Sequence, residues 1–401
     1  MQRLLALIPP GASRIDLLAP PFAGHLNPVL AMGRALAEHY QVRILSTPKA
    51  LPRIHAAGLT GVAIEGEYDD VLCAVANPQY AVKTHPVRLY RQFREVVGLL
   101  VNFSHALAQY WRDEGTPDLV ISDFTLPVVG EVCHQFSVPW WTSLPSPCAL
   151  ETADGVPGYC GGLLPPRNKF ERVIQCLHRK KVRGFKRCIF WLFRKTIRPT
   201  GIHRLYREDG SESAYSAHCI LALSEERFEF PRTWPAAVHF IGPALYTPPV
   251  IVPQPPFETG KRHVLVTLGT HLDWHKAEVT RAVAKLAQTL PDWVFHFTLG
   301  NPDTASVAHQ SNLYCLPWVD YDRWVSEYDA VIHHGGAGIM WHCLKAERPA
   351  LVYPVDYDQF DHAARLAWHG KGIWLKGGIH ALEQARPLLL RLVQSTVKNE
   401  K

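Results

Sequence analysis

The sequence lacks any apolar run near the roughly 18 residues that span a bilayer, and it has no C-x-x-C pair. The first absence argues against a membrane-spanning helix, and the second argues against a zinc site. The nine cysteines are scattered and odd in number, so they indicate no disulfide framework and fit a reduced cytosol. The apolar run at the amino terminus is too short for a signal peptide. We therefore expect a cytoplasmic protein.

The chain has 401 residues, of which 47% are hydrophobic and 19% are charged. This length predicts two domains, each able to bury its own core. Residues 246–262 contain five prolines, a density that excludes helix and central strand. We therefore predict a first domain at residues 1–245 and a second at 263–401, joined by an extended linker over 246–262.

Residues 331–359 read as strand, turn, helix and strand, which is one βαβ unit. The turn is His334-Gly335-Gly336-Ala337-Gly338, and Asp358 and Gln359 follow the second strand. Glycines let the backbone approach a ligand, and the amides that begin the next helix favour an anion. The His334 imidazole adds a donor, while Asp358 and Gln359 suit sugar hydroxyls. The alternative is a turn that needs glycine only for packing.

Residues 15–46 show the same pattern, with Gly24 and His25 in a predicted turn over 20–28. A histidine titrates near neutral pH, so His25 can act as a general base. A buried strand pattern ends at Asp123, whose carboxylate can orient a histidine at a neighbouring strand end. The alternatives are a histidine that only hydrogen-bonds locally and an aspartate that caps the next helix.

These strings together resemble the UDP-glucuronosyltransferase-like and macrolide-glycosyltransferase-like enzymes. The resemblance rests on Gly24-His25-Leu26-Asn27-Pro28, on the glycine turn after His334, and on Asp358-Gln359 at this spacing. It covers most of the chain and is weakest in residues 50–115 and 150–215. It implies an α/β GT-B fold, with two Rossmann-like doubly wound domains facing a cleft and the last helix crossing back to the first domain.

The resemblance also implies roles for individual residues. His25 would remove the acceptor proton and Asp123 would orient it. The nucleoside-diphosphate sugar would contact Gly24, Thr270, Trp318, His334, Gly335, Gly336, Ala337, Gly338, Asp358 and Gln359. Trp318 would stack on the base, unless it is a core residue, and Thr270 would touch phosphate, unless its turn is only structural. We expect neither a cofactor nor a metal, because His334 and the turn amides would stabilise the leaving diphosphate.

The predicted function is inverting sugar transfer from a UDP or dTDP sugar to a hydroxyl of an apolar small molecule or lipid-like acceptor. Two residues depart from the family pattern: Ile339 replaces a Ser or Thr, and His342 replaces a Glu that binds the ribose. Asp320-Tyr321 also replaces a Pro-Gln pair after Trp318. These departures leave open a non-catalytic binding protein or, on the same architecture, a nucleotide-sugar epimerase.

Residues 167–198 hold twelve Lys or Arg and one Glu, a net charge of +11 in a chain whose total is +6. Within them, residues 170–196 repeat apolar residues at intervals of three and four, with basic residues opposite. Such a basic amphipathic helix predicts peripheral attachment to an anionic membrane surface. The alternative is an ordinary helix with its apolar face on the core. No recognition module accompanies the charge, so we expect no nucleic-acid partner.

Overall fold

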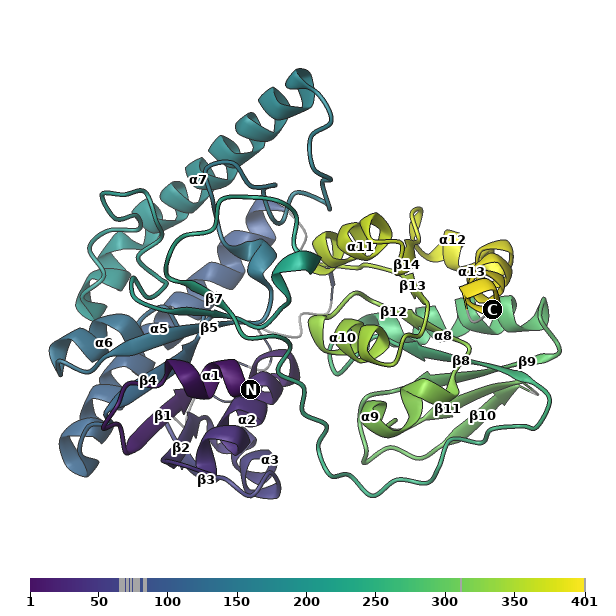
Figure 1. Ribbon diagram of the computed structural model, residues 1–401, viewed down its shortest axis with the longest axis horizontal. Coiled ribbons are helices and arrows are strands. Elements are labelled where there is room, and N and C mark those ends of the chain that lie inside the picture. The colour runs from purple at the N-terminus through teal and green to yellow at the C-terminus, as the bar shows by residue number, and fades with distance from the viewer. Residues whose placement is uncertain are drawn as a thin grey trace. The chain divides into compact units, whose positions relative to one another are not determined.

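The computed structural model describes residues 1–64, 69, 72, 74, 80–81, 85–310 and 312–399. The chain divides into two compact units, and each contains one seven-stranded sheet (Figure 1). The first unit lies within residues 1–248, and the second consists mainly of residues from 249 onward. This division falls inside the stretch 246–262 that was predicted as a linker, and residues 249–258 form neither helix nor strand.

The sheet of the first unit has the strand order β3-β2-β1-β4-β5-β6-β7, and all its pairings are parallel. Its strands are β1 (Arg14–Leu18), β2 (Gln41–Ser46), β3 (Thr60–Ala63), β4 (Leu119–Asp123), β5 (Trp140–Leu144), β6 (Ile220–Ala222) and β7 (Val238–Phe240). Its longer helices are α1 (Gln2–Leu7), α2 (Ala23–Ala37), α3 (Leu51–Ala56), α5 (Pro86–Glu114), α6 (Val129–Gln135) and α7 (Lys169–Ile197).

Successive residues of a strand point to opposite faces of the sheet, and both faces of this sheet are apolar. Helices therefore pack against both of them. Leu17 of β1 packs with α1, α2 and α3, whereas the next residue, Leu18, packs with α5 and α6. The strands are therefore apolar on both faces, which explains their nearly continuous hydrophobic runs. A buried charge interrupts the apolar run of β1: Asp16 accepts two hydrogen bonds of 2.7 Å from Arg43 and one of 3.0 Å from the Trp111 indole.

The sheet of the second unit has the order β10-β11-β9-β8-β12-β13-β14, parallel except for the edge strand β10. Its strands are β8 (Arg262–Thr267), β9 (Trp293–Thr298), β10 (Val307–Gln310), β11 (Leu313–Leu316), β12 (Ala330–His333), β13 (Ala350–Val352) and β14 (Gly372–Trp374). Its helices are α8 (Asp273–Gln288), α9 (Tyr321–Trp324), α10 (Ala337–Lys345), α11 (Gln359–Trp368), α12 (Gly378–Glu383) and α13 (Arg386–Asn399).

Apolar clusters lie on both faces of the second sheet as well. Val264 and Val266 of β8 pack with α8, α12 and α13, while Leu265 packs with α10 on the other side. Both units are thus doubly wound parallel α/β sheets, and the predicted fold class is confirmed. The buried residues of α13 lie in the core of the second unit, so its crossing back to the first stays a prediction.

One local prediction was wrong. Most of the turn predicted over residues 20–28 is instead the beginning of α2, which starts at Ala23 and includes His25 and Pro28. Gly, Asn and Pro favour turns, but Leu26, Val29 and Leu30 are fully buried, and their packing holds this segment as helix. His25 therefore lies on the first turn of a helix, where its position is better fixed than in a loop.

Candidate active site

His25 and Asp123 lie side by side at the carboxyl edge of the first sheet. Asp123 is the last residue of β4, which neighbours β1, and His25 lies in the helix that follows β1. His25 Nδ1 is 3.1 Å from Asp123 Oδ1 and 3.2 Å from Oδ2. The Asp123 side chain is fully buried, whereas that of His25 is 27% exposed. The structure thus brings together the two residues predicted as base and orienting partner.

The Asp123 carboxylate fixes the orientation of the His25 ring. Because the carboxylate only accepts hydrogen bonds, Nδ1 must carry the proton, which places the basic lone pair on Nε2. Asp123 Oδ1 also accepts hydrogen bonds from the backbone amide and the hydroxyl of Thr125. Asp123 therefore holds the turn that follows β4 and contacts His25 at the same time, but it does not cap the next helix, α6, whose N-cap residue is Val128 and has no side-chain capping hydrogen bond.

The second sheet gathers most of the other predicted residues at its own carboxyl edge. Strands β8, β12 and β13 are neighbours, and they are followed by Thr270, by the turn from His334 and by Asp358-Gln359. Trp318 follows β11 in the same sheet. Gly24 belongs to the first unit, where it is exposed and precedes His25 on α2. The edge of an open parallel sheet is where such folds bind ligands.

Gly335 is held in place through both of its backbone polar groups. Its amide donates to His333 Nδ1 at 3.0 Å, and its carbonyl accepts from His362 Nδ1 at 2.6 Å. Its φ is +92°, and a Cβ atom there would lie 2.8 Å from the Gln359 carbonyl oxygen. The position therefore requires glycine. Sequence reasoning missed His333 and His362; the adjacent His333-His334 pair was the available signal for the first.

The His334 ring packs against two glycines. A Cβ atom on Gly269 would lie 3.0 Å from Cε1 of the ring, and one on Gly336 would lie 2.4 Å from Nε2. Burial lowers the pKa of His334 to about 4, against an opposing contribution from a hydrogen bond to the Thr267 backbone. Its Nδ1 has no partner among the described residues. At neutral pH His334 is therefore an uncharged ring beside the first turn of α10.

Gln359 has a role that the sequence did not show. Its side-chain oxygen accepts hydrogen bonds from the backbone amides of Val355 at 2.8 Å and Asp356 at 3.0 Å. It therefore shapes the loop after β13, and only its amide nitrogen remains for a sugar hydroxyl. The carboxylate of Asp358 lies 3.9 Å from Nε2 of His362. Trp318 is half-buried, and its indole N–H has no partner among the described residues.

The two residues that depart from the family pattern have different surroundings. Ile339 is buried with Leu265 and Val331 in the core, so a hydroxyl is replaced there by a packing side chain. His342 is also buried, and its Nδ1 lies 3.5 Å from Oδ1 of Asp322. Burial lowers the pKa of His342, with Asp322 opposing that shift. A carboxylate is thus present next to His342, although it comes from α9 instead of α10.

The prediction of no metal cannot rest on a lack of the Asp-x-Asp string with which other glycosyltransferases hold a metal, because the sequence contains two such strings. They are Asp320-Tyr321-Asp322 and Asp356-Tyr357-Asp358. Asp320 caps α9 by accepting from the Arg323 amide, and Asp356 accepts from the Tyr357 amide. Within the described ranges, no group of three or more His, Cys, Asp or Glu residues could hold a metal ion.

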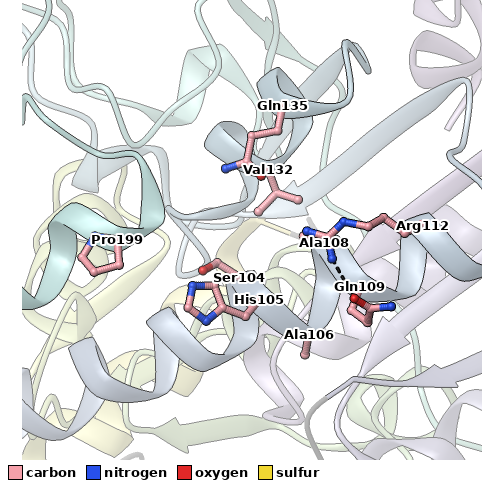
Figure 2. Close-up of a pocket in the computed structure, with 9 residues that line it drawn as sticks. All are labelled: Ser104, His105, Ala106, Ala108, Gln109, Arg112, Val132, Gln135 and Pro199. Carbon is pink, nitrogen blue, oxygen red and sulfur yellow. Dashed lines mark hydrogen bonds between the residues drawn. The ribbon is translucent and has the colours of Figure 1, made fainter.

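A separate cavity of about 610 Å³ lies in the first unit (Figure 2). Its lining is largely polar and comes from α5, α6 and the turn after α7, including Ser104, His105, Gln109, Arg112, Gln135 and Pro199. Within this lining, Arg112 Nη1 donates to Gln109 Oε1 at 2.7 Å along α5. No residue predicted for the site lines this cavity, so it is not the place of the predicted chemistry.

The helices give no sign of a membrane span: none in the described part of the chain is both long and apolar enough to cross a bilayer.

Residues 263–377 match the glycosyltransferase family 28 C-terminal domain. A zeaxanthin glucosyltransferase from Pseudescherichia vulneris is 30% identical over 159 residues, which are 38% of this chain and 37% of that relative. An O-mycaminosyltylonolide 6-deoxyallosyltransferase from Streptomyces fradiae is 25% identical over 88% of this chain and 83% of its own length. The match is therefore short for the first relative and nearly complete for the second.

Solved structures share the fold over nearly the whole length of this chain. The glycosyltransferase of kitacinnamycin covers 96% of this chain, with 91% of its own length matched, a TM-score of 0.70 and 18% identity. The spinosyn rhamnosyltransferase SpnG complexed with thymidine diphosphate covers 96% of this chain and 94% of its own, with a TM-score of 0.61 and 19% identity. Domain match, relatives and fold agree with the motif resemblance: residues 263–377 match a glycosyltransferase domain, and the chain has the fold of the GT-B glycosyltransferases.

Proposed function

We propose that the protein moves a sugar from a nucleoside-diphosphate sugar to a hydroxyl of an apolar small molecule or lipid-like acceptor, with inversion at the anomeric carbon. The observation that carries this proposal is the contact of 3.1 Å between His25 Nδ1 and Asp123 Oδ1. A buried carboxylate that orients a partly exposed imidazole is the arrangement of a general base.

In the proposed reaction, Nε2 of His25 takes the proton from the acceptor hydroxyl. The acceptor oxygen forms a bond to the anomeric carbon while the bond from that carbon to the diphosphate oxygen breaks on the opposite face. The electron pair of the broken bond leaves with the diphosphate, and the anomeric configuration inverts. Asp123 stabilises the imidazolium that results, since its carboxylate already accepts from Nδ1.

The donor half of the proposal rests on the turn from His334 to Gly338. The amides that begin α10, together with the helix dipole, favour the negative charge that grows on the diphosphate. His334 lies beside them as an uncharged ring whose one N–H already bonds to the Thr267 backbone, and Trp318 offers a flat apolar face for the base. We expect UDP or dTDP as the nucleotide; the thymidine diphosphate bound by SpnG supports the second. No resident cofactor is needed for these steps.

The acceptor is proposed from the relatives. One is named for zeaxanthin and the other for O-mycaminosyltylonolide, which supports a lipid-like or natural-product hydroxyl. A cytoplasmic protein attached peripherally to a membrane would meet such acceptors where they partition. The rival function, a non-catalytic binding protein, is favoured by Ile339, because its burial in the core removes a hydroxyl from the phosphate turn.

The deciding experiment is a transfer assay on purified protein with UDP-glucose and dTDP-glucose, with zeaxanthin or a sterol as acceptor, read by mass spectrometry. A glycosylated acceptor supports the proposal. A changed donor sugar without acceptor indicates an epimerase. Nucleotide binding without either product, seen as thermal stabilisation, indicates a binding protein. A ligand at a hundred times its Kd adds about 2.7 kcal/mol, which is easily seen in a melting curve.

A further inference from the structure

Helix α7 turns much of its apolar surface away from the protein. The ordinary arrangement would bury the apolar side chains on the core and expose the basic ones, yet only Gln175 and Phe193 of this helix are buried. Phe170 is 73% exposed, and Trp191 is 59% exposed. The exposed large apolar residues of the helix are Phe170, Val173, Leu177, Phe185, Trp191 and Leu192. In a structured unit, an apolar face of this extent marks an interaction surface.

Three basic residues, Arg179, Arg183 and Lys186, lie on the inner side, where acceptors in the same unit hold them. Lys186 Nζ lies 2.7 Å from Glu151 and 2.7 Å from Glu212, and Arg183 pairs with Glu151 at 3.3 Å. Arg179 donates to the Gly155 carbonyl at 2.9 Å. Rotating the helix to bury its apolar side would leave Glu212, which is only 7% exposed, without its cation. These contacts therefore fix which side of α7 faces outward.

Aromatic residues of α5 pack against α7. Tyr90 stacks on Phe193 with ring centroids 5.4 Å apart, and Phe93 lies 6.2 Å from Phe185. The outward side then carries a stripe with helical spacing, which we call the α7 stripe: Phe170, Val173, Leu177, Lys180, Lys181, Gly184, Cys188, Trp191, Leu192 and Lys195. Lys180, Lys181 and Lys195 form no ion pair with any residue in the described part of the chain.

We propose that the α7 stripe is the surface by which the protein docks on an anionic lipid bilayer. Apolar side chains with lysines among them match a bilayer interface, where the rings enter the headgroup region and the ammonium groups meet lipid phosphates. The charge of this region also suits an anionic bilayer: residues 167–198 carry a net +11, and the rest of the chain carries a net −5. An anionic surface is therefore attracted to this helix and repelled by the remainder.

A second copy of the chain fits the stripe less well than a bilayer. An isologous contact between two such stripes would bring Lys180, Lys181 and Lys195 of one copy near those of the other. Like charges brought together in a contact that excludes water are unfavourable. The proposal depends on α7 alone and goes beyond sugar transfer, so the two can fail separately.

The test is co-sedimentation of purified full-length protein with vesicles of phosphatidylcholine, with or without phosphatidylglycerol. We expect binding only to the anionic vesicles. The triple variant Lys180→Glu, Lys181→Glu, Lys195→Glu should bind at least tenfold more weakly. The matched control is Arg281→Glu, Lys371→Glu, Arg391→Glu, which makes the same change in net charge at exposed positions of the second unit and should bind like the wild type.

A second variant, Leu177→Gln with Trp191→Gln, tests the apolar part and should also weaken binding, with an unchanged circular dichroism spectrum showing that the protein is folded. The proposal is overturned if the wild type ignores anionic vesicles, or if the α7 triple variant and the control bind equally. It is also overturned if the wild type is a dimer without vesicles that the Leu177→Gln, Trp191→Gln variant converts to monomer, because the occupant would then be a second copy.

Discussion

The carboxyl edges of the two doubly wound sheets present different groups. At the first edge, the chemistry lies in two side chains, His25 and Asp123, 3.1 Å apart. At the second edge, the backbone of Gly335 and the helix start after it form the surface, and the side chains of His333 and His362 hold that backbone. A side-chain site loses its function when one group is removed, whereas a backbone site is lost when its shape changes.

The largest expected effect is at the first edge. Replacing His25 by Gln removes the base but keeps a polar side chain of similar size, so kcat should fall by roughly 10²–10⁴-fold. The Kd for nucleotide should stay within about twofold, because His25 lies on a different sheet edge from the phosphate turn. Steady-state kinetics and calorimetry measure the two quantities.

The control for this change is His39→Gln, an exposed position just beyond the end of the same helix, which should retain full activity. If His25→Gln kept its activity, or lost nucleotide binding together with activity, the division of roles between the two edges would be wrong.

The next effect is at the second edge, where Gly335→Ala alters the backbone. The new Cβ would meet the Gln359 carbonyl at 2.8 Å, and alanine disfavours a φ of +92°. We expect a loss of about 1–3 kcal/mol in the free energy of unfolding and a weaker Kd for nucleotide. Urea unfolding and calorimetry check both. The matched control is Gly338→Ala, where nothing lies within 4 Å of the added Cβ; equal damage from both variants would refute the explanation.

A smaller effect is expected at Gln359, whose side chain supports the loop. Gln359→Met keeps the volume but removes the oxygen that accepts from the Val355 and Asp356 amides, which costs roughly 1–3 kcal/mol of stability. Gln359→Glu keeps an accepting oxygen and should melt within a few degrees of the wild type. Differential scanning calorimetry compares the three proteins, and an unaltered melting temperature in Gln359→Met would show that the loop does not need this acceptor.

The smallest and most gradual effect is a dependence on pH. Burial lowers the pKa of His333 to about 3 and that of His334 to about 4, from an ordinary value of 6.5. Between about pH 6.5 and those values the unfolded chain binds protons that the folded chain does not, so stability falls as the pH decreases through this window. The stability of His333→Asn, which keeps an acceptor for the Gly335 amide, should depend less on pH. His218→Asn, at an exposed position, should match the wild type.

Short strings of sequence were enough to predict the fold and most of the candidate positions, because strand ends in parallel sheets always meet at one edge. His25 and Asp123 could be paired in this way, since each follows or ends a neighbouring strand. The helical state of His25 could not, because turn-forming residues around it are overruled by the burial of Leu26 and Leu30. The turn propensity of neighbouring residues does not reflect packing contacts with distant parts of the unit.

The roles of His362 and Gln359 were also out of reach of sequence reasoning. His362 bonds to the carbonyl of Gly335, which is 27 residues away, and nothing in the local pattern at either residue indicates the other. The orientation of α7 was out of reach for the same reason. Its periodicity defined two faces, but the partners that decide between them, Glu151 and Glu212, lie well outside the helix in sequence.

The ion pairs between α7 and the rest of its unit also affect how readily the helix can bind a partner. A basic segment that is disordered in solution must lose conformational entropy when it folds on its target, and this reduces its affinity. Lys186, with Glu151 and Glu212 at 2.7 Å, already keeps α7 folded and in one rotation before any encounter. Any partner of this face therefore meets a rigid, preorganised surface, so association requires correct approach and no folding step.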